Sequence, residues 1–211
     1  MNKKNLKKKI NDLAKHLVSD KAKIAIETLL HEVAEIVENE QDQVFGESIG
    51  FDLPREVVGK SNAYALFTDG ACRGNPGPGS YAFMIQAPDG KIFEEDSGVS
   101  QHTTNNKMEL SAVIEGLKVL SNQVSPMHEI YVYTDSKYVA DGMKSWIHSW
   151  KKRGWKKADN KTPENIELWQ KLDELSHVCH VQFLWVKAHA GHPQNEYVDK
   201  MANIVLDENG F

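Results

Sequence analysis

From residue 63 onward, short apolar runs alternate with stretches in which apolar residues recur every three or four positions. The runs are rich in β-branched and aromatic residues and predict buried strands. The periodic stretches predict amphipathic helices. The expected strands are residues 63–69, 81–87, 92–99, 130–134 and 181–186, and the expected helices are residues 106–120, 137–152, 163–176 and 194–206. This order predicts an α/β fold with a mixed five-stranded sheet, in which three antiparallel meander strands are followed by two parallel strands, flanked by helices.

The first forty residues have a helical pattern throughout. One apolar stripe runs from Leu6 to Leu17 and a second from Ile26 to Val37. We therefore expect an N-terminal α-helical hairpin over residues 1–44, a linker over 45–61 and the main domain over 62–208. The apolar stripes could pack against a second copy of the chain, giving a homo-oligomer, or against a protein partner. The lysines between Lys3 and Lys9 leave open a second interpretation, in which the segment adds affinity for nucleic acid.

Composition is ordinary for a globular protein with a real core, at 40% apolar and 26% charged residues. The net charge of −5 conceals a basic stripe from Lys144 to Lys161, which carries seven basic residues and one acid. Three tryptophans interleave with these cations, as in surfaces that hold a nucleic-acid backbone. We expect some of the indoles, Trp146 and Trp150 above all, to pack in the core instead.

Cysteine content and hydropathy bear on the location of the protein. Two cysteines, Cys72 and Cys179, exclude a disulfide framework, and Cys72 is expected to be a small packing residue. Charges interrupt the apolar residues near the N-terminus, so neither a signal peptide nor a membrane span is expected. The prediction is a reduced, cytoplasmic protein that does not bind a membrane.

Two strands end in the same way, and their ends carry the candidate chemistry. The strand from Ala63 runs into Thr68-Asp69-Gly70, and the strand from Ile130 runs into Thr134-Asp135-Ser136. If these strands are parallel neighbours, the two carboxylates lie roughly 4.8 Å apart at the carboxyl edge of the sheet. Like charges so close together need a cation between them. The pattern indicates a metal-dependent enzyme.

Two further carboxylates are candidates for the same site. Glu109 lies in the first turns of a helix, and Asp199 lies in the last helix, after a segment with two histidines. Oxygen ligands of this kind suit Mg²⁺, with Mn²⁺ as the alternative. Two such ions can activate a water and stabilise the leaving oxygen at phosphorus.

These segments together resemble the type 1 ribonucleases H of bacteria. The resemblance rests on Thr68 to Gly79, Thr103 to Leu110, Thr134 to Val139, the basic stretch Trp146 to Trp155, and Trp185 to Asp199, and it covers about residues 62–208. It implies a ribonuclease H-like fold and an endonuclease that hydrolyses the RNA strand of RNA–DNA hybrids with two divalent ions, leaving 5′-phosphate and 3′-hydroxyl ends.

The resemblance also implies roles for individual residues. Asp69, Glu109, Asp135 and Asp199 would be the metal ligands, and His189 would handle a proton or assist product release. The substrate-binding residues would be Asn75, Thr104, Asn105, Asn106, Lys137, Trp146, Lys151, Lys152, Arg153, Trp155 and Lys156. Two departures stand out: Ala188 replaces the usual glycine and could strain the histidine loop, and Lys137 replaces a frequent glutamine.

Other interpretations of these residues are weaker but open. A DNA strand-transfer domain or a fragment of a reverse transcriptase would share the acidic sheet edge, and a hybrid-binding module without activity would share the basic stretch. The start at Met and the lack of a Tyr-x-Asp-Asp segment argue against the reverse transcriptase. The glycines 74, 77 and 79 precede a strand and predict a hairpin turn, not a phosphate loop. A zinc site is a minor alternative, and it would use His177, Cys179, His180, His189 and His192.

Overall fold

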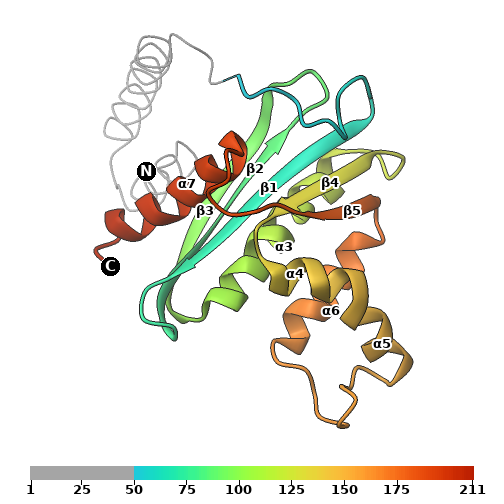
Figure 1. Ribbon diagram of the computed structural model, residues 1–211, viewed down its shortest axis with the longest axis vertical. Helices are drawn as coiled ribbons and strands as arrows, with labels where there is room; N and C mark the ends of the chain where they lie inside the picture. The colour runs from blue at the N-terminus through green and yellow to red at the C-terminus, as the bar shows by residue number, and fades with distance from the viewer. Residues whose placement is uncertain (1–49) are drawn as a thin grey trace, which may run out of the picture. The chain divides into compact units, whose positions relative to one another are not determined.

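A five-stranded sheet organises the part of the chain that the computed structural model describes, residues 50–211 (Figure 1). The chain divides into the units Met1–Gly50 and Phe51–Phe211. The predicted N-terminal hairpin and the first residues of the predicted linker lie outside the described residues, so both stay predictions. No helix in residues 50–211 is long and apolar enough to cross a membrane.

The strands are β1 (Ala63–Cys72), β2 (Gly77–Gln86), β3 (Ile92–Thr103), β4 (Glu129–Thr134) and β5 (His180–Trp185). Their order in the sheet is β3-β2-β1-β4-β5. The pairs β1–β2 and β2–β3 are antiparallel, whereas β1–β4 and β4–β5 are parallel. The predicted mixed sheet, with three meander strands and two parallel strands, is therefore confirmed.

The helices are α3 (Asn105–Gln123), α4 (Lys137–Asp141), the π-helical turn η1 (Gly142–Trp146), α5 (Ile147–Lys152), α6 (Ile166–Ser176) and α7 (Pro193–Glu208). Helix α7 lies on one face of the sheet, and α3 and the α4–α6 region lie on the other (Figure 1). The helical segment predicted over residues 137–152 is present, as two short α-helices on either side of a π-helical turn. The turn lies where Gly142 meets Trp169 so closely that a Cβ on residue 142 would come within 2.1 Å of the indole.

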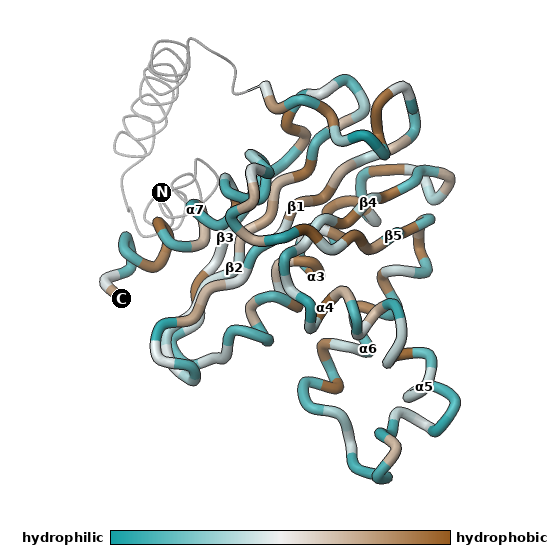
Figure 2. The backbone as a smooth tube through the Cα atoms, in the orientation of Figure 1, coloured by the Kyte–Doolittle hydropathy of each residue, from teal (hydrophilic) through white to brown (hydrophobic). Residues whose placement is uncertain are grey.

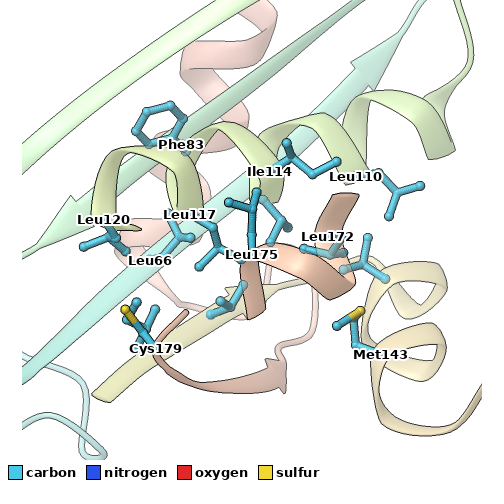
Figure 3. Close-up of a cluster of buried hydrophobic side chains, with 14 of the residues drawn as sticks. Leu66, Phe83, Leu110, Ile114, Leu117, Leu120, Met143, Leu172, Leu175 and Cys179 are labelled. Atoms are coloured by element: carbon cyan, nitrogen blue, oxygen red, sulfur yellow. The ribbon is translucent and has the colours of Figure 1, made fainter. Parts of the chain in front are cut away.

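Two hydrophobic layers hold these elements together. Leu66 and Phe83 of the sheet meet α3 and α6 in the larger cluster, of which Figure 3 shows the side chains. Across the sheet, Phe67 and Tyr133 stack with ring centroids 4.8 Å apart, near the buried Val198 and Ala202 of α7. The hydrophobic colouring follows the strands and leaves the loop after α5 mostly hydrophilic (Figure 2). Burial on both faces explains why the central strands are nearly continuous in apolar residues.

The hairpin strands are longer than predicted. Antiparallel pairing continues past Asp69 to Cys72, which pairs with Gly79, and β3 reaches Thr103, which pairs with Gly77. Asp69 therefore lies inside β1 and not at its end. The parallel pairing of β1 with β4 nevertheless stops at Thr68 and Thr134, so Asp69 and Asp135 each directly follow the last paired residue of two neighbouring strands.

Residues 51–60, which were predicted to belong to the linker, pack against the sheet and α7. Val57 is fully buried, and the rings of Phe51 and Tyr197 are 5.4 Å apart. The side-chain amides of Gln86 and Gln194 each donate a hydrogen bond of 2.7 Å, to the carbonyls of Phe51 and Asp52 respectively. The sequence shows no period here, and this packing could not be predicted from it.

Candidate active site

Three carboxylates from three elements converge at the carboxyl edge of the parallel strands. Asp69 comes from β1, Glu109 from α3, and Asp135 follows β4. Each offers an oxygen, and the three oxygens lie within 4.8 Å of one another. This is the meeting of carboxylates predicted from the two similar strand ends, with the helix adding a third.

The position of Glu109 depends on the start of α3 and on a glycine beneath it. Thr104 caps the helix by accepting a hydrogen bond from the backbone N–H of Lys107. The helix then crosses β1 at Gly70, where a Cβ would lie 2.3 Å from the backbone nitrogen of Glu109. Only glycine lets the two backbones approach so closely. The Thr-Asp-Gly sequence therefore supplies one carboxylate of the cluster and the space that lets the helix bring in the next.

Mutual repulsion and burial set the electrostatics of the site. Burial of the Asp69 carboxyl, together with the charges of Asp135 and Asp199, raises its pKa to about 7. Burial and the charges of Asp69 and Asp135 also raise the pKa of Glu109 well above its ordinary range. A cation between these groups would offset the repulsion and favour the ionised forms.

Two buried acceptor oxygens at the site have no hydrogen-bond partner. One is Oε2 of Glu109 and the other is Oδ1 of Asn195. The second oxygen of Glu109 accepts a long hydrogen bond of 3.4 Å from Asn105, and the amide nitrogen of Asn195 donates to Asp135 at 3.3 Å. Burying an acceptor without a partner costs about 1–3 kcal/mol. A divalent cation and its waters would satisfy both oxygens, so the residues fit such an ion.

Asp199 stands apart from the three converging carboxylates. It lies on α7, half-buried, and accepts a hydrogen bond of 3.0 Å from the amide of Asn203. It is not part of the group whose oxygens lie within 4.8 Å of one another, although its charge contributes to the raised pKa of Asp69. The structure therefore brings together three of the four predicted ligands and places the fourth close enough to act through its charge.

His189 lies in an exposed loop and has a positive φ of 50°. Ala188, whose side chain was expected to strain this loop, is not among the described residues with positive φ. The expected strain therefore does not fall on the alanine. Histidine tolerates the left-handed region better than most residues do.

Among residues 50–211, no other group of three or more potential metal-ligating side chains comes within coordinating range. The zinc alternative therefore lacks the geometry that it needs. Both Cys72 and Cys179 are free, and Cys179 is buried in the core.

Several predicted substrate residues lie beside the carboxylates. The side-chain oxygen of Asn75 accepts a hydrogen bond of 3.2 Å from the backbone N–H of Asn105. Asn105 in turn contacts Glu109, and Asn106 is exposed on the same first turn of α3. Lys137 is exposed at the start of α4. These contacts place Asn75 and the start of α3 next to one another although they are distant in sequence.

The basic stretch follows α4 and is built around clustered indoles. The rings of Trp146 and Trp150 have centroids 5.9 Å apart, and Trp150 lies 5.7 Å from the buried Trp169. Trp146 is 37% exposed, so its predicted place in the core is wrong, and Trp150 is half-buried.

The charged residues of this stretch reach the solvent. Lys152, Arg153 and Lys156 are exposed, whereas Trp155 is half-buried and donates its backbone N–H to Trp150 at 2.7 Å. Lys151 forms an ion pair of 2.8 Å with Asp173. The cations thus lie next to a cluster of packed indole rings.

Two residues at the site were not predicted. Asn195 is buried and bonded to Asp135, and its spacing of four from Asp199 on one helix face is a signal that could have found it. Trp185 is 45% exposed, and its indole N–H donates to the carbonyl of Asp135 at 2.9 Å. Its place at the end of an apolar strand gave no sign of exposure.

Comparison with known proteins agrees with this geometry. A sequence model of the RNase H family matches residues 61–206. The ribonuclease H of Rhodopseudomonas palustris (strain TIE-1) is 46% identical over 144 residues, which are 68% of this chain and 89% of that protein.

Solved structures show the same relationship. The crystal structure of LC9-RNase H1, a type 1 RNase H with the type 2 active-site motif, superimposes with a TM-score of 0.63 at 31% identity, covering 75% of each chain. LC11-RNase H1 in complex with an RNA/DNA hybrid is similar with a TM-score of 0.54 at 25% identity, covering 69% of this chain and 98% of that one. With its acidic sheet edge and these matches, the chain belongs to the ribonuclease H family and, within it, to the type 1 enzymes.

Proposed function

We propose that the chain is an endonuclease that hydrolyses the RNA strand of RNA–DNA hybrids, leaving 5′-phosphate and 3′-hydroxyl ends. The observation that carries the proposal is the convergence of Asp69, Glu109 and Asp135 in a chain that belongs to the ribonuclease H family. An RNA/DNA hybrid is bound in the structure of the similar LC11-RNase H1, which supports the same substrate here.

The carboxylates would hold divalent ions, Mg²⁺ or alternatively Mn²⁺, and two ions are proposed per site. Asp69, Glu109 and Asp135 are the ligands supported by geometry, and Asp199 would complete the set. When bound, such ions activate a water and stabilise negative charge on the leaving oxygen. Hard oxygen ligands and two unpartnered buried acceptors favour these ions over softer metals.

The residues of the chain itself position the substrate and the ligands. Asn105 donates its side-chain amide to Glu109 and its backbone N–H to the side-chain oxygen of Asn75, so it links the two residues. Asn195 holds Asp135. In the proposed reaction the exposed His189 gives a proton to the departing 3′-oxygen, which leaves as the 3′-hydroxyl, or assists product release.

Recognition would depend on the shape of the hybrid and on its sugars. Asn75, Thr104, Asn105 and Asn106 would face the minor groove, which in a hybrid displays base edges and 2′-hydroxyls. The basic stretch would hold the phosphates, through Lys151, Lys152, Arg153 and Lys156, with Trp146 and Trp155 beside them. Little sequence preference is expected.

Two wider predictions remain part of the proposal. The free cysteines support a cytoplasmic location. The N-terminal segment is proposed to bind a second copy or another protein, and a comparison of the mass in solution of the full chain and of a chain without residues 1–49 tests this.

Side-by-side cleavage assays test the function. End-labelled hybrid, RNA–RNA and DNA–DNA duplexes are incubated with the full chain in Mg²⁺ or in excess EDTA, with the Asp69→Asn variant as a control. We expect cleavage of the RNA strand of the hybrid alone, in Mg²⁺ alone, and none by the variant. Cleavage of the DNA duplex in place of the hybrid would favour strand-transfer chemistry, and binding of hybrid without cleavage would overturn the assignment as an enzyme.

A further inference from the structure

Trp185 is a large aromatic side chain exposed beside the carboxylates. It ends β5, is 45% exposed, and pairs in register with Thr134, the residue before Asp135. Exposed tryptophans next to a charged site are uncommon in a surface that serves only stability, since indole is among the side chains most enriched where proteins bind partners.

The indole is fixed in place by its own hydrogen bond. Its N–H donates to the backbone carbonyl of Asp135 at 2.9 Å, and the backbone N–H of Val186 donates to the carbonyl of Thr134 at 3.0 Å. The end of β5 is therefore tied to the chain on both sides of the bond that joins Thr134 and Asp135. Trp185 thus helps to define where the carboxylate of Asp135 lies.

The same ring holds a cation. The ammonium of Lys137 lies 4.9 Å from the centroid of the Trp185 ring, within the range of a cation–π contact. Lys137 is exposed, and it lies two residues after Asp135. A flexible lysine is thereby held beside the carboxylates, where its ammonium could meet a phosphate of a bound strand.

We infer that Trp185 is a positioning residue of the site, whose ring holds Lys137 against a substrate phosphate and whose N–H fixes the backbone of Asp135. The inference rests on the proposed function, because it takes the ligand to be an RNA–DNA hybrid. The inference gives the Trp185 side chain two separate roles. The aromatic face serves binding, and the indole N–H serves turnover.

The two roles predict different effects for two substitutions. Trp185→Phe keeps an aromatic face and removes the donor, so kcat should fall about tenfold, with KM nearly unchanged. Trp185→Leu removes both, so KM should rise as well. Lys137→Gln removes the charge alone, so the dissociation constant of the hybrid should rise about threefold to tenfold.

Salt dependence identifies the phosphate contact. The dissociation constant of a fluorescent hybrid is measured in EDTA over a range of KCl concentrations, where no turnover occurs. Lys137→Gln and Trp185→Leu should each reduce the slope against salt by about 0.7 to 0.9, the amount expected for one phosphate contact. Lys137→Arg should restore the slope. Lys91→Gln, at a side chain that is 84% exposed in the turn before β3, is the matched control and should leave it unchanged.

The double variant is the decisive measurement. If Trp185 acts by holding Lys137, adding Lys137→Gln to Trp185→Leu should weaken binding no further than either change alone. The inference would be overturned if the fold-increases in dissociation constant of the two single variants multiplied in the double variant. An unchanged salt slope in Trp185→Leu would overturn it as well. A parent chain that fails to bind or cleave hybrid would instead refute the proposed function, so the two failures can be told apart.

Discussion

A Cβ on residue 70 would lie 2.3 Å from the backbone nitrogen of Glu109, so the helix that carries this carboxylate rests directly on a glycine of the strand that carries Asp69. The contact joins two of the three carboxylates through backbone atoms, which cannot move aside as a flexible side chain can. The spacing of the site is therefore set where β1 and α3 cross.

Gly70→Ala should consequently damage the site as well as the fold. Real Cβ atoms are not found at such distances, so α3 must shift, and Glu109 moves with it. Misplacement of about 1 Å in a reacting group can cost about 10²-fold in rate. The expected result is a loss of kcat of this size together with a lower melting temperature, measured by hybrid cleavage and thermal unfolding.

Gly59→Ala is the control for this substitution. Gly59 has a φ of 77°, and no atom lies within 4 Å of the point where a Cβ would stand, so alanine there strains the backbone without a clash. It should cost about 1–2 kcal/mol of stability and leave kcat unchanged. Equal activity losses in the two variants would show that the close approach of α3 is not the cause.

The stability of the metal-free protein should depend on pH through Asp69. Its pKa is raised from 3.8 to about 7 in the folded protein, so folding is favoured while the group is protonated. This contribution is complete below about pH 4 and is lost as the pH rises to about 7 and beyond. Each pKa unit corresponds to about 1.4 kcal/mol, so the loss from this group is on the order of 4 kcal/mol.

Urea unfolding in EDTA between pH 4 and pH 8 measures this loss. Asp69→Asn should make the decline of stability with pH shallower. At pH 8, Mg²⁺ should raise the stability of the unmodified chain more than that of the variant. Asp141→Asn, at an exposed acid on α4, serves as the matched control and should leave the decline unchanged. A decline that is the same in all three proteins would contradict the assignment to Asp69.

Asp199 should matter less than Asp69. It contributes charge to the site but does not share the close spacing of the other three oxygens. Asp69→Asn is expected to reduce kcat by at least about 10²- to 10³-fold, and Asp199→Asn by clearly less. Calorimetric titration with Mg²⁺ gives an independent comparison, in which Asp199→Asn retains weakened binding. If the two variants lost activity and Mg²⁺ affinity equally, Asp199 would have to be a ligand of the same rank.

Lys151 and Lys152 should differ although they are neighbours. The double change Lys151→Ala with Lys152→Ala is expected to raise KM far more than it lowers kcat, since phosphate contacts support binding. Because Lys151 already forms an ion pair with Asp173, Lys152→Ala alone should account for most of the rise. Steady-state kinetics at moderate salt measure this, and an unchanged KM in the double variant would refute the role of the basic stretch.

Much of this site was predictable because its information is local. The Thr-Asp repeats at two strand ends, and the strand order that makes them neighbours, predicted that Asp69 and Asp135 would meet. Glu109 was a candidate from its place in the first turns of a helix, and the family resemblance supported it. The position of α7 on the sheet sets the separation of Asp199 and the contact of Asn195 with Asp135. The pairing of β5 with β4 sets the position of Trp185. The periodicity of the sequence predicts helices and strands, but not how they pack against one another.

The same holds for the fold. Periodicity found every strand and the helical stretch over residues 137–152, but it did not predict where that stretch divides. The π-helical turn begins at Gly142, which packs closely against Trp169, and a contact between residues so distant in sequence leaves no local pattern. Tertiary contact of this kind overrides local propensity.

The packing of residues 51–60 changes what counts as the catalytic unit. The carbonyls of Phe51 and Asp52 receive the amides of Gln86 and Gln194, and Gln194 directly precedes Asn195 on α7. Removal of residues 51–61 would thus take one acceptor from Gln86 of β2 and another from Gln194 of α7, the helix whose Asn195 bonds to Asp135. An isolated nuclease intended for biochemical work should accordingly begin no later than residue 50.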